Sequence, residues 1–189
     1  RLVPGKYGLS EQSSLLLNEG GKFSDATATW LPSLAKAFEC VTSACFADLD
    51  RDGDPDLVVA GEWAPVRIFR NERNAFSEQS ASLGTDQLYG WWNAVEAADL
   101  NGDGWTDLVS VNYRSGSIYW VEHPGSELGA WSKHVLDTPG PMETGRLVDV
   151  DGDGNLDILP NGVEFAAWWE LKREAQNGGT RVVGIRRDW

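Results

Sequence analysis

The sequence contains only two histidines, His123 and His134, and neither lies near a recognisable nucleophile motif. Histidine is the side chain most often used for proton transfer in catalysis, so its scarcity leaves little material for an active site. Because His123 precedes a Pro-Gly turn, we expect it to be an exposed loop residue. Pairs of glutamates suited to glycoside hydrolysis could exist, but a sequence does not set the distance between them. We therefore expect a protein that is not an enzyme.

Long apolar runs and basic clusters are lacking as well. No stretch approaches the roughly 18 apolar residues that a membrane-spanning helix needs, so no membrane span is expected. The first residues, Arg-Leu-Val-Pro-Gly, lack the apolar core of a secretion signal, so we expect a mature, trimmed or internal chain. There are 16 lysines and arginines against 29 aspartates and glutamates, which gives a net charge of −13. Nucleic-acid binding requires basic residues gathered on one face, so no nucleic-acid partner is expected.

Cysteine is scarce too, with only Cys40 and Cys45 in the chain. In an extended strand, side chains five residues apart point to opposite faces and lie too far apart for a disulfide. A turn over residues 41–44 would bring the two together. Two interpretations therefore stay open, a disulfide or two buried free thiols.

The negative charge that the chain does have is concentrated in three short segments. Twelve aspartates lie in residues 48–56, 99–107 and 149–157, and without them the net charge of −13 would be −1. Acidity that is so local requires a local explanation, such as a bound cation.

These segments belong to a repeat, because they begin 51 and then 50 residues apart. An apolar stretch precedes each segment and a β-rich run follows it. A third run carries an aromatic residue in phase, at Phe69, Trp120 and Trp168, and a fourth run completes the period. Each period thus contains four short strands separated by turn residues.

Four-stranded units of about 40–50 residues are typical of β-propeller blades. Helical repeats of similar length are the competing interpretation, but helical periodicity is absent except weakly around residues 31–38. We predict an all-β fold, a β-propeller with a partial blade at its N-terminus, because residues 15–24 match residues 68–77. The predicted ranges are 1–32 for the partial blade and 33–83, 84–137 and 138–189 for three full blades.

Three blades and part of another are too few for a ring, since closed propellers have about four to eight. An open stack would expose strand edges that can pair with another chain. We expect the chain to meet further propeller blades, either of a longer chain or of a second one. A small four-bladed ring, in which the first and last segments share strands, is the other possibility.

The pattern within each acidic segment is D-x-[DN]-x-D-G-x-x-D, which suits a Ca²⁺ ion with six to eight oxygen ligands. Positions one, three, five and nine offer side-chain oxygens, position seven offers its backbone carbonyl, and the glycine at position six permits a sharp turn. We expect about three Ca²⁺ ions, one per loop, which would bring the charge to near −7. The predicted metal-binding residues are Asp48, Asp50, Asp52, Asp54 and Asp56; Asp99, Asn101, Asp103, Trp105 and Asp107; and Asp149, Asp151, Asp153, Asn155 and Asp157.

Three other interpretations of the loops fit the sequence less well. An EF-hand needs a glutamate at position twelve and flanking helices, whereas position twelve here is Val59, Ser110 or Pro160 and the flanks are strands. Aspartate-rich turns that only bond their own backbone are common singly, but three copies in register favour metal binding. Mg²⁺ is less suited, because it keeps its waters and rarely uses an all-protein cage.

The loops resemble those of the FG-GAP and VCBS repeat families, which include the integrin α-subunit propeller and many secreted bacterial proteins. The segments at residues 17–27, 56–63 and 90–93 are similar to stretches of bacterial VCBS-repeat proteins that also carry an ASPIC/UnbV module. The resemblance implies a calcium-binding propeller outside the cytoplasm.

Tryptophan is abundant, with 10 residues in 189. Trp120 and Trp168 repeat with Phe69, so we expect them in the blade core. Trp91 and Trp92 have no aromatic counterpart in the other periods and lie just before a loop, so they are the candidates for a ligand surface.

These observations favour a calcium-stabilised module for recognition, adhesion or assembly, with a protein or carbohydrate ligand. We expect it to be secreted, periplasmic or on the cell surface, where millimolar calcium would fill even weak sites. The alternative is a propeller scaffold within a secreted enzyme that acts on polysaccharides, because fold alone does not choose between these functions.

Overall fold

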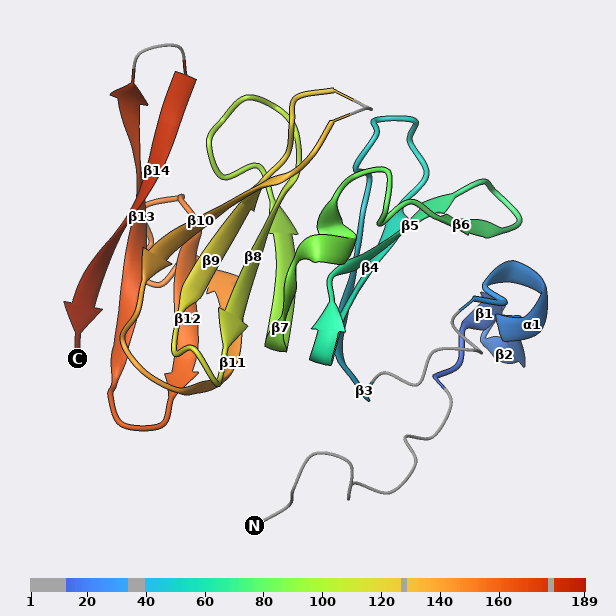
Figure 1. Cartoon of the computed structure of the whole chain (residues 1–189), viewed down its shortest axis with the longest axis horizontal. Helices are drawn as coiled ribbons and strands as arrows, with labels where there is room; N and C mark the ends of the chain where they lie inside the picture. Colours follow the sequence, from blue (N-terminus) through green and yellow to red (C-terminus); the bar gives the residue numbers. More distant parts are fainter. Residues whose placement is uncertain (1–12, 34–39, 127–128, 177–178) are drawn as a thin grey trace.

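Three four-stranded antiparallel units follow one another along the chain and stand side by side (Figure 1). The computed structural model describes residues 13–33, 40–126, 129–176 and 179–189. We call the units the first, second and third blades, and they confirm the predicted all-β class and its four-strand period. Their strands are β3 (Cys40–Ala47), β4 (Asp56–Pro65), β5 (Arg67–Asn71) and β6 (Phe76–Glu78); β7 (Tyr89–Ala98), β8 (Asp107–Asn112), β9 (Ile118–Glu122) and β10 (Ser132–Asp137); and β11 (Met142–Val148), β12 (Asp157–Gly162), β13 (Ala167–Gln176) and β14 (Gly179–Asp188).

A hairpin precedes the first blade, at the place where a partial blade was predicted. It consists of β1 (Leu16–Glu19) and β2 (Lys22–Asp25), and a single-turn helix, α1 (Thr27–Trp30), follows it. Gly20 and Gly21 form the turn with positive φ of 61° and 88°, which suits a tight hairpin. Leu31, just after the helix, is fully buried against the first blade. The residues before 13 lie outside the described residues.

The blades are held together by apolar layers between them, because each central strand buries both of its faces. Along β4, Leu57 and Val59 face the N-terminal segment, while Val58 and Ala60 face the second blade. This alternation with a period of two is what a strand requires, and it makes β4 an almost continuous apolar run. The layer between the second and third blades is built in the same way, around Trp120 and Trp169 among others.

The first two blades are also joined edge to edge, which the sequence did not predict. The end of β4 pairs with the start of β7, where Glu62 lies opposite Trp91 and Pro65 opposite Tyr89. The register shifts between Glu62 and Ala64, and Trp63 at this bulge has a positive φ of 58°. The first and second blades thus merge into one eight-stranded sheet, whereas β11 to β14 form a sheet of their own.

The third strand of each blade carries a buried aromatic residue, but not in the predicted phase. In the first blade Phe69 pairs with Leu57, the residue after the last loop aspartate. In the third blade the residue at the equivalent position is Trp169, which pairs with Ile158. In the second blade Trp120 pairs with Val109, which is the second residue after the last loop aspartate and not the first. Trp168 is buried as expected, yet Trp169 is the residue that is fully enclosed. The predicted alignment of the third blade is therefore shifted by one residue, from Trp169 to Trp168. A shift of one residue matters because it moves a side chain to the other face of a strand.

The two cysteines are free, and both lie in the single strand β3. No disulfide is therefore formed, as the strand argument requires. Cys40 is exposed, so the expectation of two buried thiols holds only in part, since Cys45 is half-buried. Burial raises the pKa of the Cys45 thiol to about 12. No helix among the described residues is long and apolar enough to cross a membrane.

Candidate metal sites

The three aspartate-rich loops occupy the same position in the three blades. Each connects the first strand to the second, so that the last loop aspartate is also the first residue of β4, β8 or β12. In the view of Figure 1 the loops lie at the upper ends of these strands. The repeat in the sequence is therefore a repeat in space.

The first and sixth positions of each loop are linked by one hydrogen bond. The carboxylate at position one accepts from the backbone N–H of the glycine at position six, at 3.1 Å in the first loop, 2.9 Å in the second and 3.0 Å in the third. Those glycines, Gly53, Gly104 and Gly154, have φ of 90°, 87° and 89°. L side chains rarely adopt this conformation, so the glycine is required by the backbone.

Position four also has a positive φ, which sequence reasoning missed. Gly102 and Gly152 both have φ of 80°, whereas the first loop has Arg51 at this position with φ of 64°. The signal was present in the sequence, because two of the three loops carry a glycine there. Arg51 is held by other contacts, since its guanidinium lies 4.1 Å from the centre of the Trp105 ring.

The last aspartate of each loop is buried and ties three segments together. Asp56, Asp107 and Asp157 are 2%, 0% and 1% exposed. One carboxylate oxygen accepts from the backbone N–H at position two of the loop, at 3.0 Å, 3.0 Å and 2.9 Å. In the first two blades the other oxygen accepts from a backbone N–H of the third strand or next to it. The donor is Asn71, the last residue of β5, in the first blade and His123, the residue after β9, in the second. This position is therefore structural as well as acidic.

Burial raises the pKa of these carboxylates, and a bound cation would have the opposite effect. Desolvation raises the pKa of Asp56 to about 6 and that of Asp107 to about 6. Desolvation also raises the pKa of Asp157 and of Asp50. A divalent cation at this point would favour the ionised form of each group.

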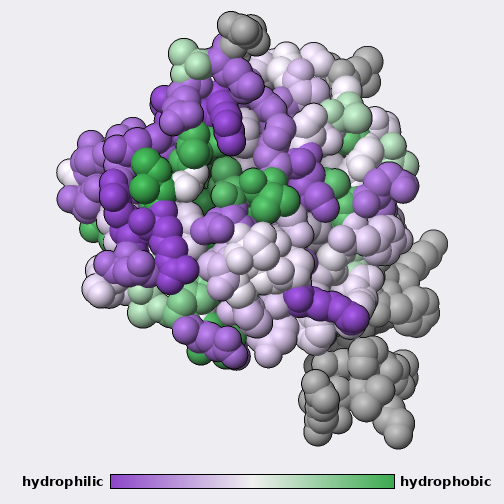
Figure 2. Space-filling view, turned by 60° about the vertical axis from the view of Figure 1, so that its left-hand side comes forward, coloured by the Kyte–Doolittle hydropathy of each residue, from purple (hydrophilic) through white to green (hydrophobic). Residues whose placement is uncertain are grey.

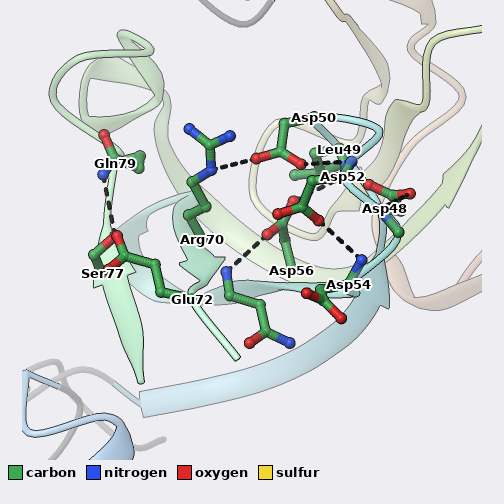
Figure 3. A network of polar contacts seen from close by, with 12 residues as sticks. Asp48, Leu49, Asp50, Asp52, Asp54, Asp56, Arg70, Glu72, Ser77 and Gln79 are labelled. Carbon is green, nitrogen blue, oxygen red and sulfur yellow. Dashed lines mark hydrogen bonds and ion pairs between the residues drawn. The ribbon is translucent and has the colours of Figure 1, made fainter. Parts of the chain in front are cut away.

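The first loop gathers carboxylate oxygens closely enough for a metal ion (Figure 3). One oxygen each of Asp48, Asp50 and Asp56 lies within 4.8 Å of the others. The Oδ1 atom of Asp48 is buried and has no hydrogen-bond partner, which is costly for a carboxylate. Asp50 pairs with Arg70 on β5. Asp54 turns away and pairs with Arg73 at 3.1 Å, so its side chain is not directed at the cluster.

The third loop forms a similar group from Asp149, Asp151 and Asp157. Asp151 and Asp153 also approach Glu170 on β13. Glu170 is already paired with Lys172 at 2.7 Å and with Arg187, so its charge is largely compensated. Among the described residues, Asp149, Asp151 and Asp157 are therefore the better set of the two for a cation.

The second loop differs because an amide replaces one carboxylate. Asn101 accepts from the backbone N–H of Asp103 at 2.9 Å, as the aspartate does at this position in the other loops. Its NH₂ group donates to Asp103 and to Glu122, at 3.2 Å and 3.3 Å. In the part of the chain that the structure describes, no cluster of three acidic ligand groups comes from this loop.

Position seven uses its backbone, and its side chain makes other contacts. The backbone N–H of Asp54, Trp105 and Asn155 donates to the carboxylate at position five, at 2.9 Å, 2.8 Å and 2.7 Å. The Trp105 ring stacks on His123 with 4.6 Å between ring centres and 7° between planes.

His123 is only 6% exposed, so the expectation of an exposed loop histidine is wrong. It is enclosed between Trp105 and Trp131, whose ring centre is also 4.6 Å away. Burial lowers the pKa of His123. The cause of the error is that the two aromatic neighbours come from other segments, Trp105 from the second loop and Trp131 from the residues just before β10.

The two tryptophans proposed for a ligand surface lie in different environments. Trp92 is 1% exposed, and its indole N–H donates to the backbone oxygens of Ala64 and Leu88 at 3.1 Å and 3.0 Å. It packs in the layer between the first two blades. Trp91 is half-buried, and its ring lies 5.3 Å from that of Trp63. The hypothesis of a ligand surface is thus limited to Trp91.

Comparison with known families agrees with the repeat seen in the structure. A family model described as FG-GAP-like repeat matches residues 7–59, 48–110 and 99–159. The second and third matches each run from one acidic loop into the β-strand after the next loop, and together the matches span most of the chain. A search of curated proteins finds no match.

Proposed function

The chain belongs to the FG-GAP-like repeat family, and from this premise we propose that it is a calcium-stabilised module for recognition and assembly outside the cytoplasm. The proposal is supported most directly by the first loop, where three carboxylates converge and a buried carboxylate oxygen of Asp48 lacks a partner. Hard oxygen ligands of this kind suit Ca²⁺. When bound, the ion would compensate charge that now repels within each loop.

Positions one, three, five and nine of each loop would hold the ion. In the first loop, hydrogen bonds to the loop backbone use one oxygen of Asp48 and one of Asp52, and the other oxygen of each is available for a cation. The ion would fix the start of the second strand of each blade, because position nine is the first residue of that strand. Extracellular modules bind calcium with Kd of about 10⁻⁴–10⁻³ M, which suits a secreted, periplasmic or cell-surface location.

Partners are expected at the two ends of the blade stack. Figure 2 brings the third blade forward and shows apolar residues at the centre of that side, bordered by hydrophilic ones. Val148, Leu156 and Val163 of this blade are 39%, 42% and 50% exposed, and Phe23 of the N-terminal hairpin is 67% exposed. A further blade, in the same chain or in a second one, would cover such residues.

Calcium stoichiometry tests the proposal. Equilibrium dialysis at millimolar free calcium should give about three ions per chain, with the second loop the weakest because of Asn101. D149N should remove one ion, whereas D188N, which alters an exposed aspartate outside the loops, should remove none. Binding of less than one ion per chain would overturn the proposal. Light scattering over a range of concentrations tests assembly, which predicts multimers that grow with concentration.

A further inference from the structure

A second surface lies at the ends of the strands opposite to the acidic loops. β4 begins at the first loop and has Trp63 near its other end, and β8 begins at the second loop and is followed by Tyr113. Trp91, near the start of β7, lies between them. Together with Tyr89 and Arg114 these residues form what we call the aromatic groove, which includes a cavity of about 500 Å³.

Three rings of the aromatic groove, those of Trp63, Trp91 and Tyr113, form a platform of tilted neighbours. The ring centres of Trp63 and Trp91 are 5.3 Å apart with 42° between planes, and those of Trp91 and Tyr113 are 5.6 Å apart with 46°. Trp63 is 44% exposed, Tyr113 36% and Tyr89 65%. Large aromatic faces gathered in one exposed place are a mark of a binding surface.

The backbone conformation at Trp63 does not favour a bulky side chain. Trp63 lies at the bulge between β4 and β7 with φ of 58°. A bulky residue in this conformation is strained, and glycine or asparagine would form the same bulge at a lower free energy. The bulge itself does not require an indole, and the ring at this position is 44% exposed, which favours a role in binding.

The one charged residue that lines the cavity of the groove is Arg114, whose charge is opposite in sign to the net charge of the chain. None of the residues that line its cavity is acidic, although the net charge is −13. The exposed Arg114 places its guanidinium 4.8 Å from the centre of the Trp63 ring. In the described ranges no carboxylate forms an ion pair with Arg114. Asn112 and Ser115 add polar groups to the wall.

We propose that the aromatic groove binds a polysaccharide of uronic acids, with sugar rings stacked on Trp63 and Trp91 and a carboxylate paired with Arg114. A pyranose ring has a flat apolar face and a polar rim, which matches an aromatic platform with polar walls. The guanidinium is suited to a carboxylate because it can donate two parallel hydrogen bonds. A proline-rich peptide also binds aromatic grooves, but its prolines offer no side-chain carboxylate to Arg114. The inference names a ligand class for the recognition module proposed above and rests on that proposal.

Binding to polygalacturonate tests the inference, with the full chain in millimolar calcium. Its methyl ester is the matched control ligand, because it keeps the sugar rings and removes the negative charge. W63N retains a residue that tolerates the positive φ and should raise the apparent Kd by about tenfold or more. R114Q should weaken binding to polygalacturonate and leave binding to the ester unchanged. W189A and R181Q, which alter exposed residues away from the groove, should leave both unchanged.

Each other outcome overturns the inference. Equal binding of polygalacturonate and its ester would remove the role of Arg114, and a loss on W189A as large as on W63N would show non-specific adsorption. Capture of a proline-rich peptide in place of polygalacturonate would assign the groove to peptides. If no polysaccharide binds to a protein that still takes up calcium, the groove proposal fails and the proposed calcium module stands.

Discussion

Removal of calcium should lower the melting temperature by an amount set by the number of loops. An ion that binds only the folded state stabilises it by RT ln(1 + [Ca]/Kd), which is about 1.4 kcal/mol per site at a free concentration ten times the Kd. Three loops would then contribute about 4 kcal/mol. For a chain of this size, 1 kcal/mol corresponds to about 2–4 °C, so the expected shift is about 8–16 °C.

The assay is thermal unfolding followed by circular dichroism, in calcium and in chelator at the same ionic strength. Magnesium at the same concentration is the first control and should give a much smaller shift, because Mg²⁺ keeps its waters. D153N should reduce the calcium-dependent shift by about a third, since it removes a carboxylate from one of three loops. D188N is the matched substitution outside the loops and should leave the shift unchanged.

Equal melting temperatures in calcium and in chelator would refute the reasoning. So would a shift in magnesium as large as that in calcium, because the loops would then respond only to general charge screening. A D188N variant that loses as much of the shift as D153N would show that the response does not come from the loops.

Three further predictions concern the loops, the core and one ion pair. G154A should lower the free energy of unfolding by about 1–2 kcal/mol because of the φ of 89° alone, since no atom lies within 4 Å of the added Cβ. G179A is equally open but has no positive φ, so it should lower the free energy of unfolding less in the same urea titration. W169A should cost about 3–5 kcal/mol by urea unfolding, because this ring is fully enclosed; a cost below about 1 kcal/mol would contradict its place in the core. The hydrogen bond from Arg67 lowers the pKa of Glu78 from its ordinary value of 4.5. The ion pair therefore stabilises the fold fully above pH 4.5, and this stabilisation is lost as the pH falls through the lower pKa of the folded state. The difference in melting temperature between wild type and E78Q should therefore be present at neutral pH and vanish in acid, and a difference that persists in acid would exclude this ion pair as its cause.

The sequence predicted the features that depend on neighbours within one period. The loop pattern is local, and the glycine at position six is required by a φ near 90° in all three copies. The alternation along residues 57–60 is local as well, because successive side chains of a strand face opposite layers. Four strands per period followed from these signals together with the turn residues between them.

The remaining features depend on contacts between segments that lie apart in the sequence, within one blade or between two, which a local pattern does not contain. His123 is buried because Trp105 and Trp131 enclose it from other segments. Trp92 belongs to the core because the first blade covers it, whereas its neighbour Trp91 reaches the surface. The alternation of faces along β7 separates these two residues, and only the pairing of β7 with β4 shows which of them is outside.

The acidic loops and the aromatic groove lie at opposite ends of the same strands, which would link the proposed calcium binding to the proposed recognition. Asp56 begins β4 and Trp63 lies near its end; Asp107 begins β8 and Tyr113 follows its end. A cation that fixes the starts of β4 and β8 would also limit the relative motion of their other ends, where the groove rings meet. The groove is built across the seam between two blades, so its ring spacing depends on the two blades keeping their register. Calcium would therefore act on ligand binding through the order of the strands, without any contact between the ion and the ligand.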